Sequence, residues 1–184
     1  GLVFADAIST VSKTYAEEIK TPYFGEQLDG LLRKRAGDLY GILNGIDAAQ
    51  YDPATNQYLE AHYTADDLSG KAVNKEWLQR DMGLTVSPDT PLIAMVSRLT
   101  QQKGIDLVEH VLDDLLRQDV QMVILGAGEE RYSEFFAWAA WRYNGRLAAR
   151  TEYNEGLSHR VYAGADMFLM PSRFEPCGLS QLIA

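Results

Sequence analysis

Two basic side chains, Arg98 and Lys103, lie close together in the segment VSRLTQQKGI. An apolar run precedes this segment and an amphipathic run follows it, so it is expected to connect a strand to a helix that Gly104 opens. Two fixed cations beside the exposed backbone N–H groups of a helix N-terminus form a site for a phosphate or diphosphate. The alternative is a solvated loop whose cations pair with surface carboxylates, as exposed ion pairs commonly do.

One carboxylate, Glu175, occurs in the segment SRFEPCGLS near the end of the chain. Pro176 stiffens the backbone after it, and Gly178 permits close approach of a ligand to the backbone at a helix start. The N–H groups of Cys177, Gly178 and Leu179 could therefore face an anion or sugar hydroxyls. Equally, Glu175 could cap the following helix and Cys177 could be a small buried residue. These roles are not exclusive.

A tyrosine, Tyr153, is expected in another strand-to-helix loop, where its ring could cover a nucleotide base. A loop tyrosine more often packs on its own domain, so both interpretations stay open. His159, on the predicted helix that follows, is expected to be structural rather than a general base. The segment VILGAGEE contains Gly126 and Gly128, but Arg131 stands where the third glycine of a dinucleotide fingerprint would fall. This departure argues against a nicotinamide or flavin site.

The composition limits the classes of partner. The chain has 184 residues, 46% of them hydrophobic, and a formal net charge of −9, which suits one α/β domain with or without part of a neighbour. The acidic balance argues against a nucleic-acid or anionic-membrane partner. No apolar run approaches the roughly 20 residues of a membrane span, and the N-terminus lacks the basic region of a signal peptide, so we expect a cytoplasmic protein. The single cysteine excludes internal disulfides, and the scattered histidines give no metal-ligand spacing.

From Pro91 onward, strand-like apolar runs alternate with amphipathic helix-like runs. The predicted strands are LIAMVS, VQMVILG, RLAART and DMFLMPS, and the predicted helices are GIDLVEHVLDDLL, EERYSEFFAWAAWRY and EGLSHRVYAGA. This alternation predicts a Rossmann-like, doubly wound parallel sheet that is covered on both faces. Ligands of such sheets bind at the loops that follow the strands, which are the loops discussed above.

The segment before Pro91 is less regular. ADAISTVSKTYAEEI predicts a short strand that enters a helix, with Ser12 as its N-cap and Ser9 as the alternative. LYGIL predicts another strand before an Asn44-Gly45 turn, and residues 51–63 predict a connection. The capping-box pattern TADD predicts a helix from Thr64 to Met82.

Several of these motifs together resemble a known family. TVSKTYAEEI, GILNGID, VSRLTQQKG, LGAGE and YNEGLSHRVYAGADMFLMPSRFEPCGLSQL are similar to the bacterial glycogen synthases and plant starch synthases of glycosyltransferase family 5. The resemblance covers nearly the whole chain. It implies an α/β, two-domain GT-B glycosyltransferase, in which residues 1–42 end the N-terminal, acceptor-side domain and residues 43–184 form an incomplete C-terminal nucleotide-sugar-binding domain.

The resemblance also implies an activity and a set of residues. The activity is retaining transfer of glucose from ADP-glucose to the non-reducing end of an α-1,4-glucan such as glycogen, with no cofactor and no metal. Arg98 and Lys103 resemble the pair that neutralises the donor diphosphate, and Glu175 resembles the acid that binds the transferred glucose. The remaining implied donor-binding residues are Asn44, Tyr153, Cys177, Gly178, Leu179 and Ser180.

The family pattern is not complete. Related retaining transferases carry a second glutamate at the position of Ile183, which argues against a mechanism with two carboxylates from this segment. Because the family continues beyond both ends of this sequence, we expect the isolated chain to transfer no glucose. The alternative function is a nucleotide-binding module without catalysis. ADP binding without NAD binding would distinguish the glucosyltransferase and the nucleotide-binding module from a third possibility, a dinucleotide-dependent oxidoreductase.

Overall fold

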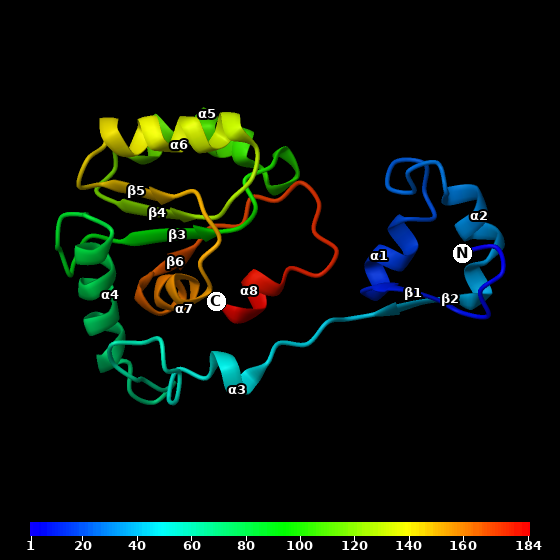
Figure 1. The fold of residues 1–184 in the computed structure, drawn as a ribbon, viewed down its shortest axis with the longest axis horizontal. Helices are drawn as coiled ribbons and strands as arrows, with labels where there is room; N and C mark the ends of the chain where they lie inside the picture. Colours follow the sequence, from blue (N-terminus) through cyan, green and yellow to red (C-terminus); the bar gives the residue numbers. More distant parts are fainter. The chain divides into compact units, whose positions relative to one another are not determined.

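The structure, a computed structural model, describes residues 1–184 and divides them into two units (Figure 1). The first unit comprises Gly1–Ile46 and Glu175–Leu179, and the second comprises Asp47–Phe174 and Ser180–Ala184. Each unit has its own sheet, of two strands and four strands respectively. The assignment of the first segment to an acceptor-side domain stays a prediction.

The two strands predicted for this part of the chain, β1 (Ile8–Val11) and β2 (Leu39–Ile42), are present and pair in parallel. Helices α1 (Lys13–Glu18) and α2 (Asp29–Lys34) lie between these strands in the chain. The predicted N-cap is confirmed, because the Ser12 side chain accepts a hydrogen bond from the N–H of Tyr15. The short helix α2 was not predicted.

The second unit is built on a parallel sheet with the strand order β5-β4-β3-β6. The strands are β3 (Leu92–Val96), β4 (Gln121–Leu125), β5 (Leu147–Arg150) and β6 (Met167–Phe168). The predicted parallel α/β sheet is therefore confirmed. The last strand is shorter than DMFLMPS suggested, because only its first residues pair with β3.

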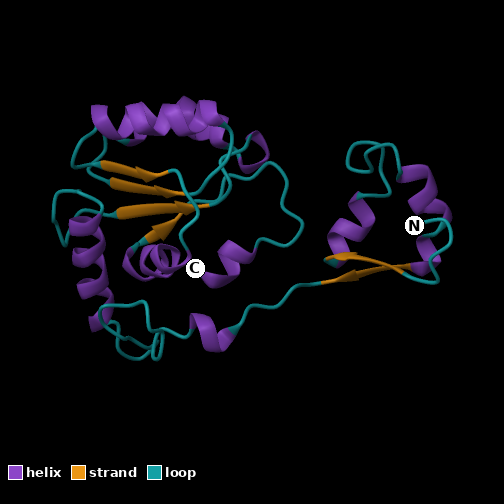
Figure 2. Ribbon diagram, viewed as in Figure 1, coloured by secondary structure: helices purple, strands orange, loops and turns teal.

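Helices cover both faces of this sheet (Figures 1 and 2). Helices α5 (Ile105–Leu115) and α6 (Glu130–Arg142) lie on one face, and α7 (Glu155–Gly164) lies on the other (Figure 1). The remaining helices are α3 (Ala48–Tyr51), α4 (Ser69–Asp81) and α8 (Leu179–Ile183). None of the helices is both long enough and apolar enough to cross a membrane.

The strands are mostly apolar because each side of the sheet has its own core. Ile93 and Met95 of β3 belong to a buried cluster with the apolar faces of α5 and α6. Leu92 and Ala94 point the other way and join a second cluster with α4 and α7. Alternate residues of one strand therefore serve two cores, as expected for a doubly wound sheet.

Helix α4 begins at Ser69, later than the predicted start at Thr64. Thr64 and Asp67 instead close a turn of their own, in which the Thr64 hydroxyl accepts a hydrogen bond from the Asp67 N–H. The Asp67 carboxylate then accepts from the Ser69 N–H at the actual helix start. The prediction was wrong because Thr and Asp side chains stabilise such turns as well as they cap helices.

Candidate functional site

The carboxyl ends of the parallel strands define one edge of the sheet in the second unit. Because β3, β4 and β5 run parallel, the connections that follow them leave from this same edge. Arg98 and Lys103 lie on the β3–α5 connection, and Tyr153 lies on the β5–α7 connection. The Ser180 hydroxyl donates a hydrogen bond of 3.4 Å to the carbonyl of Val96, the last residue of β3. Four predicted site residues thus belong to this edge.

The backbone on either side of Arg98 is bonded to the β4–α6 connection. Leu99, which is buried, pairs with Gly128 in an isolated parallel bridge. Its N–H donates to the carbonyl of Ala127 over 3.0 Å, and its carbonyl accepts from Glu129 over 2.8 Å. A Cβ on Gly128 would lie 2.2 Å from the Leu99 carbonyl oxygen, so this glycine permits close packing of two backbones. The G-x-G turn therefore has a packing role.

The side chain of Arg98 is exposed and forms no hydrogen bond or ion pair within the protein. The alternative in which Arg98 pairs with a surface carboxylate is therefore not seen. Lys103 is half-buried and ends a 3₁₀ turn (Gln101–Lys103), in which its N–H donates to the carbonyl of Thr100 over 3.0 Å. An unpaired guanidinium on a fixed backbone suits an anion from solution.

Helix α5 starts after Gly104 and carries an acidic residue, Asp106, in its first turn. Gly104, with φ of 72°, is buried, and its carbonyl accepts hydrogen bonds from the N–H groups of Leu107 and Val108 over 3.0 Å and 3.2 Å. Arg173 donates to the Asp106 carboxylate in the first turn, and this hydrogen bond lowers the pKa of the Asp106 carboxyl. The predicted anion site at this helix start stays a prediction.

Tyr153 is 84% exposed, and its ring contacts no other aromatic ring. The next residue, Asn154, caps α7 by accepting a hydrogen bond from the Leu157 N–H over 2.9 Å. The cap fixes the backbone after Tyr153 while the phenol ring faces solvent. Of the two interpretations left open, packing on the domain is not seen, and the ring is accessible to a base.

The other predicted residues belong to the first unit, which is described separately. Asn44 is exposed beyond the end of β2. Glu175 and Cys177 are half-buried, Leu179 is 41% exposed, and the thiol of Cys177 is free. Gly178 is buried with φ of 81°, a backbone conformation that favours glycine. The assembly of these residues with Arg98 and Lys103 into one donor site stays a prediction.

A further unpaired cation, Arg150, was missed by the sequence analysis. It ends β5 with an exposed side chain that forms no ion pair. With Glu152, Asn154 and Arg160, among others, it lines a cavity of about 350 Å³ beside Tyr153. RLAART was interpreted only as a strand. A single sequence contains no pattern that marks a residue at the carboxyl end of a strand as part of a site.

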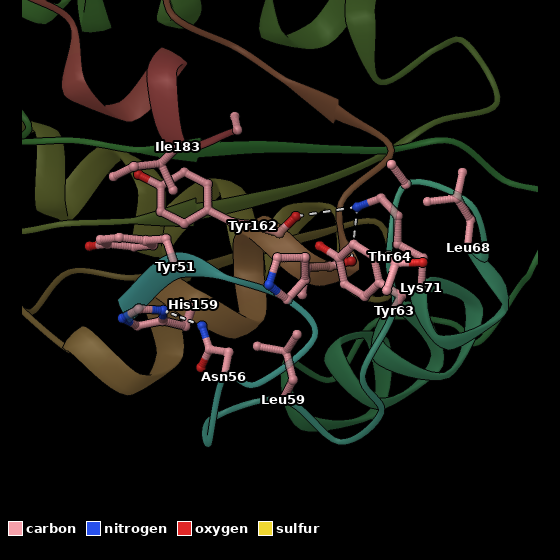
Figure 3. A pocket seen from close by; sticks show the side chains of 14 residues that line it. Tyr51, Asn56, Leu59, Tyr63, Thr64, Leu68, Lys71, His159, Tyr162 and Ile183 are labelled. Atoms are coloured by element: carbon pink, nitrogen blue, oxygen red, sulfur yellow. Dashed lines mark hydrogen bonds between the residues drawn. The ribbon is translucent and has the colours of Figure 1, made fainter. Parts of the chain in front are cut away.

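A separate cavity of about 340 Å³ lies in the second unit and contains none of the predicted donor residues (Figure 3). Tyr51, Tyr63 and Tyr162 line it with Ile183. Lys71 donates hydrogen bonds to the carbonyls of Ala163 and Ala165, each over 3.0 Å. These bonds satisfy carbonyl groups at the end of α7, so this lysine has a structural role.

His159 is 2% exposed and lies between two tyrosine rings of the 47–63 segment. The ring centroids of Tyr51 and Tyr58 are 4.5 Å and 4.8 Å from that of His159, in stacked geometry. Nδ1 of His159 lies 2.8 Å from the side-chain nitrogen of Asn56, and Nε2 is buried without a partner (Figure 3). Burial lowers the pKa of His159. The residue thus joins α7 to the preceding segment, in agreement with a structural role.

Comparison with family models gives two matches. The description "Starch synthase catalytic domain" matches residues 1–34, and "Glycosyl transferases group 1" matches residues 83–182. The second match contains the three connections described above. It covers more than half of the chain.

Named relatives are similar to this chain along nearly its whole length. The chain is 59% identical over 182 residues to a glycogen synthase of Anaeromyxobacter sp. (strain Fw109-5), and 52% identical over 184 residues to a glycogen synthase of Clostridium novyi (strain NT). These alignments cover 99% and 100% of this chain. The chain spans 38% of the length of each relative. The resemblance to glycogen synthases is therefore confirmed.

Solved structures give the same result for the fold. The catalytic domain of starch synthase IV from Arabidopsis thaliana, bound to ADP and acarbose, superposes with a TM-score of 0.92 at 36% identity, over 99% of this chain and 38% of that chain. The Anabaena protein Alr3699/HepE, in complex with UDP and glucose, superposes over 99% of this chain and 42% of that chain, with a TM-score of 0.62 at 18% identity. The latter likeness concerns the fold alone. On this evidence the predicted GT-B architecture is confirmed, and the chain belongs to the group 1 glycosyl transferases.

Proposed function

We propose that the protein containing these residues transfers glucose from ADP-glucose to the non-reducing end of an α-1,4-glucan such as glycogen, with retention at the anomeric carbon. The observation that carries the proposal is the superposition, at a TM-score of 0.92, on a starch synthase bound to ADP and acarbose. The names of the relatives support the same activity. In this proposal the enzyme works in the cytoplasm, without a nucleic-acid or membrane partner.

The chemistry of transfer determines what the site must supply. Breaking the bond between glucose and the diphosphate builds negative charge on the departing ADP and positive charge on the sugar ring. The proposal assigns Arg98 and Lys103 to the departing diphosphate, because fixed cations stabilise such charge where it develops. Arg98 suits this role, since its guanidinium has no partner in the protein.

The donor sugar and base need neutral contacts as well as charge. The proposal assigns the carboxylate of Glu175 to the glucose hydroxyls, and the backbones of Cys177 and Gly178 to the same sugar. Tyr153 would cover the adenine, and this assignment is supported by its exposed ring. Leu179 and Ser180 would line the diphosphate and ribose, and Asn44 is a further donor-binding residue in the proposal.

No cofactor or metal is part of the proposal. No group of three or more His, Cys, Asp or Glu residues gathers in a way that could hold a metal ion. In this mechanism the cations of the protein neutralise the diphosphate. Glu175 binds and orients the sugar rather than attacking it, and Ile183 stands where a second carboxylate would be needed.

The test uses the intact 184 residues in two settings. In the first, the purified chain is titrated calorimetrically with ADP, UDP and NAD. In the second, the chain replaces the matching 38% of the Anaeromyxobacter glycogen synthase, and transfer of labelled glucose from ADP-glucose to glycogen is measured. We expect ADP to bind in preference to NAD, and the folded chimera to transfer glucose.

Each setting can contradict the proposal. A folded chimera that binds ADP but transfers no glucose would favour the module without catalysis. Binding of NAD in preference to ADP would favour the oxidoreductase. We also expect the isolated chain to be inactive, and measurable transfer by that chain would contradict this part of the proposal.

A further inference from the structure

The segment before Glu175 lies backbone to backbone against the turn that contains Lys103. The N–H of Arg173 donates to the carbonyl of Gln102 over 3.0 Å. In return, the Gln102 side-chain amide donates to the carbonyl of Phe174 over 3.2 Å. A Cβ on Gly104 would lie 2.2 Å from the carbonyl oxygen of Pro171, so the two backbones touch at this glycine. All these residues belong to the second unit.

An ion pair joins the same two segments. The guanidinium of Arg173 donates to Oδ2 of Asp106, in the first turn of α5. The other carboxylate oxygen of Asp106 is buried and has no hydrogen-bond partner. Arg173 is therefore the cation that balances this partly buried charge. Removing Arg173 would leave an uncompensated carboxylate, whereas removing the charge of Asp106 would leave an arginine that is already half-exposed.

These contacts border the two groups assigned to transfer. Lys103 lies between Gln102 and Gly104 in the chain, and Glu175 directly follows Phe174. At the far end of the Glu175 segment, the Ser180 hydroxyl bonds to the end of β3. The residues directly before and after the Glu175–Leu179 segment are thus bonded to the part of the second unit that carries Arg98 and Lys103.

We propose that Arg173, Asp106 and Gln102 form a clamp that holds residues 171–174, directly before Glu175 in the chain, against the Lys103 turn. This proposal rests on the proposed function. The three are positioning residues and not catalytic ones, because they act through Lys103 and Glu175. Transfer depends steeply on such placement, since a displacement of about 1 Å can lower a rate about 100-fold.

The test compares clamp variants with a matched pair on the same helix. In the chimera, the clamp is altered by Arg173→Gln, Asp106→Asn and Gln102→Ala. The control is Asp113→Asn, because Asp113 of α5 also pairs with an arginine of another element, Arg142 of α6, over 3.3 Å. For each variant, kcat, KM for ADP-glucose and the thermal midpoint Tm are measured.

We expect Arg173→Gln to lower kcat by about 30-fold and Asp106→Asn by about fivefold, with KM changed less than about threefold. Arg173→Lys, which keeps a cation, should retain at least about three times the kcat of Arg173→Gln. Asp113→Asn should lower Tm as much as Asp106→Asn does and leave kcat within about twofold of the parent. A structural role alone would not produce this split between kcat and Tm.

Two results would overturn the clamp. One is a kcat within about twofold of the parent in both Asp106→Asn and Gln102→Ala. The other is a loss of kcat in Asp113→Asn as large as the loss in Asp106→Asn. The two milder clamp variants decide the matter if Arg173→Gln does not fold. Failure of the proposed function is distinguishable, because the unaltered, folded chimera would then transfer no glucose.

Discussion

The β3–α5 and β5–α7 connections leave the same edge of the sheet but are built differently. The first is bonded to the β4–α6 connection through Leu99 and to the segment before Glu175 through Gln102. The second carries Tyr153 with an 84% exposed ring, fixed only by the Asn154 cap that follows it. Charge stabilisation depends on fixed geometry, whereas stacking on a base tolerates displacement. In the proposed function, the rigid connection would therefore stabilise charge and the accessible one would contact the base.

The largest effect should come from breaking the rigid connection at Gly104. Gly104→Ala would place a Cβ 2.2 Å from a backbone oxygen at a φ of 72°. We expect the free energy of unfolding of the 184-residue chain to fall by about 2–4 kcal/mol, measured by urea denaturation. Gly83→Ala is the matched control, since Gly83 has the same φ of 72° and nothing within 4 Å of its Cβ position. Equal losses in both variants would show that the contact with Pro171 is unimportant.

A large effect on rate, without an effect on folding, should come from Lys103→Ala. Loss of one group that stabilises the departing diphosphate could raise the barrier by about 3 kcal/mol, so turnover of the chimera should fall by more than about tenfold. The free energy of unfolding should change little. Lys34→Ala, on the exposed end of α2, controls for the loss of a positive charge. Near-normal turnover would remove Lys103 from the mechanism.

A smaller effect on binding alone is expected from the accessible connection. Tyr153→Ala should raise KM for ADP-glucose by about three- to tenfold and change kcat by less than about threefold, because stacking contributes about 1–3 kcal/mol per base. Stability should be unchanged, since the ring is exposed. Tyr153→Phe keeps the ring and should behave as the parent does. A loss confined to kcat would contradict a role in binding the base.

The regular part of the second unit could be predicted from the sequence because its pattern is local. The apolar runs around Ile93, Val123 and Ala148 became β3, β4 and β5, and the faces with Val108 and Leu112 became buried in α5. Parallel strands between helices then place the following loops at one edge, which is how Arg98, Lys103 and Tyr153 were found.

The rest depended on contacts between distant residues. The hydrogen bond from Arg173 to Asp106 joins residues 67 positions apart, and no local sequence pattern predicts it. Helix α3 (Ala48–Tyr51) escaped prediction because a single turn has too little periodicity. Such features follow from tertiary packing.

The two connections should also respond differently to acid. The hydrogen bond from Arg173 lowers the pKa of Asp106, so its stabilisation of the β3–α5 connection is present above the ordinary value of 3.8 and is lost only below it. Burial lowers the pKa of His159, which lies in α7, the helix that follows the β5–α7 connection. Below the ordinary histidine value of 6.5 the unfolded chain therefore binds more protons than the folded one, and stability falls as the pH falls.

The smallest expected effect is thus a local loosening of α7 between about pH 7.5 and about pH 5.5. Amide hydrogen exchange, corrected for intrinsic rates, should show a lower opening free energy for α7 at the acidic end, with α5 nearly unchanged. Tyr51, Tyr58 and Asn56 surround the imidazole, so protonation must add a charge to a buried stack. His159→Gln should abolish the difference, while His110→Gln, on the exposed face of α5, should preserve it. Equal loosening of α5 and α7 would mean that the two connections share one acid response and are not independent.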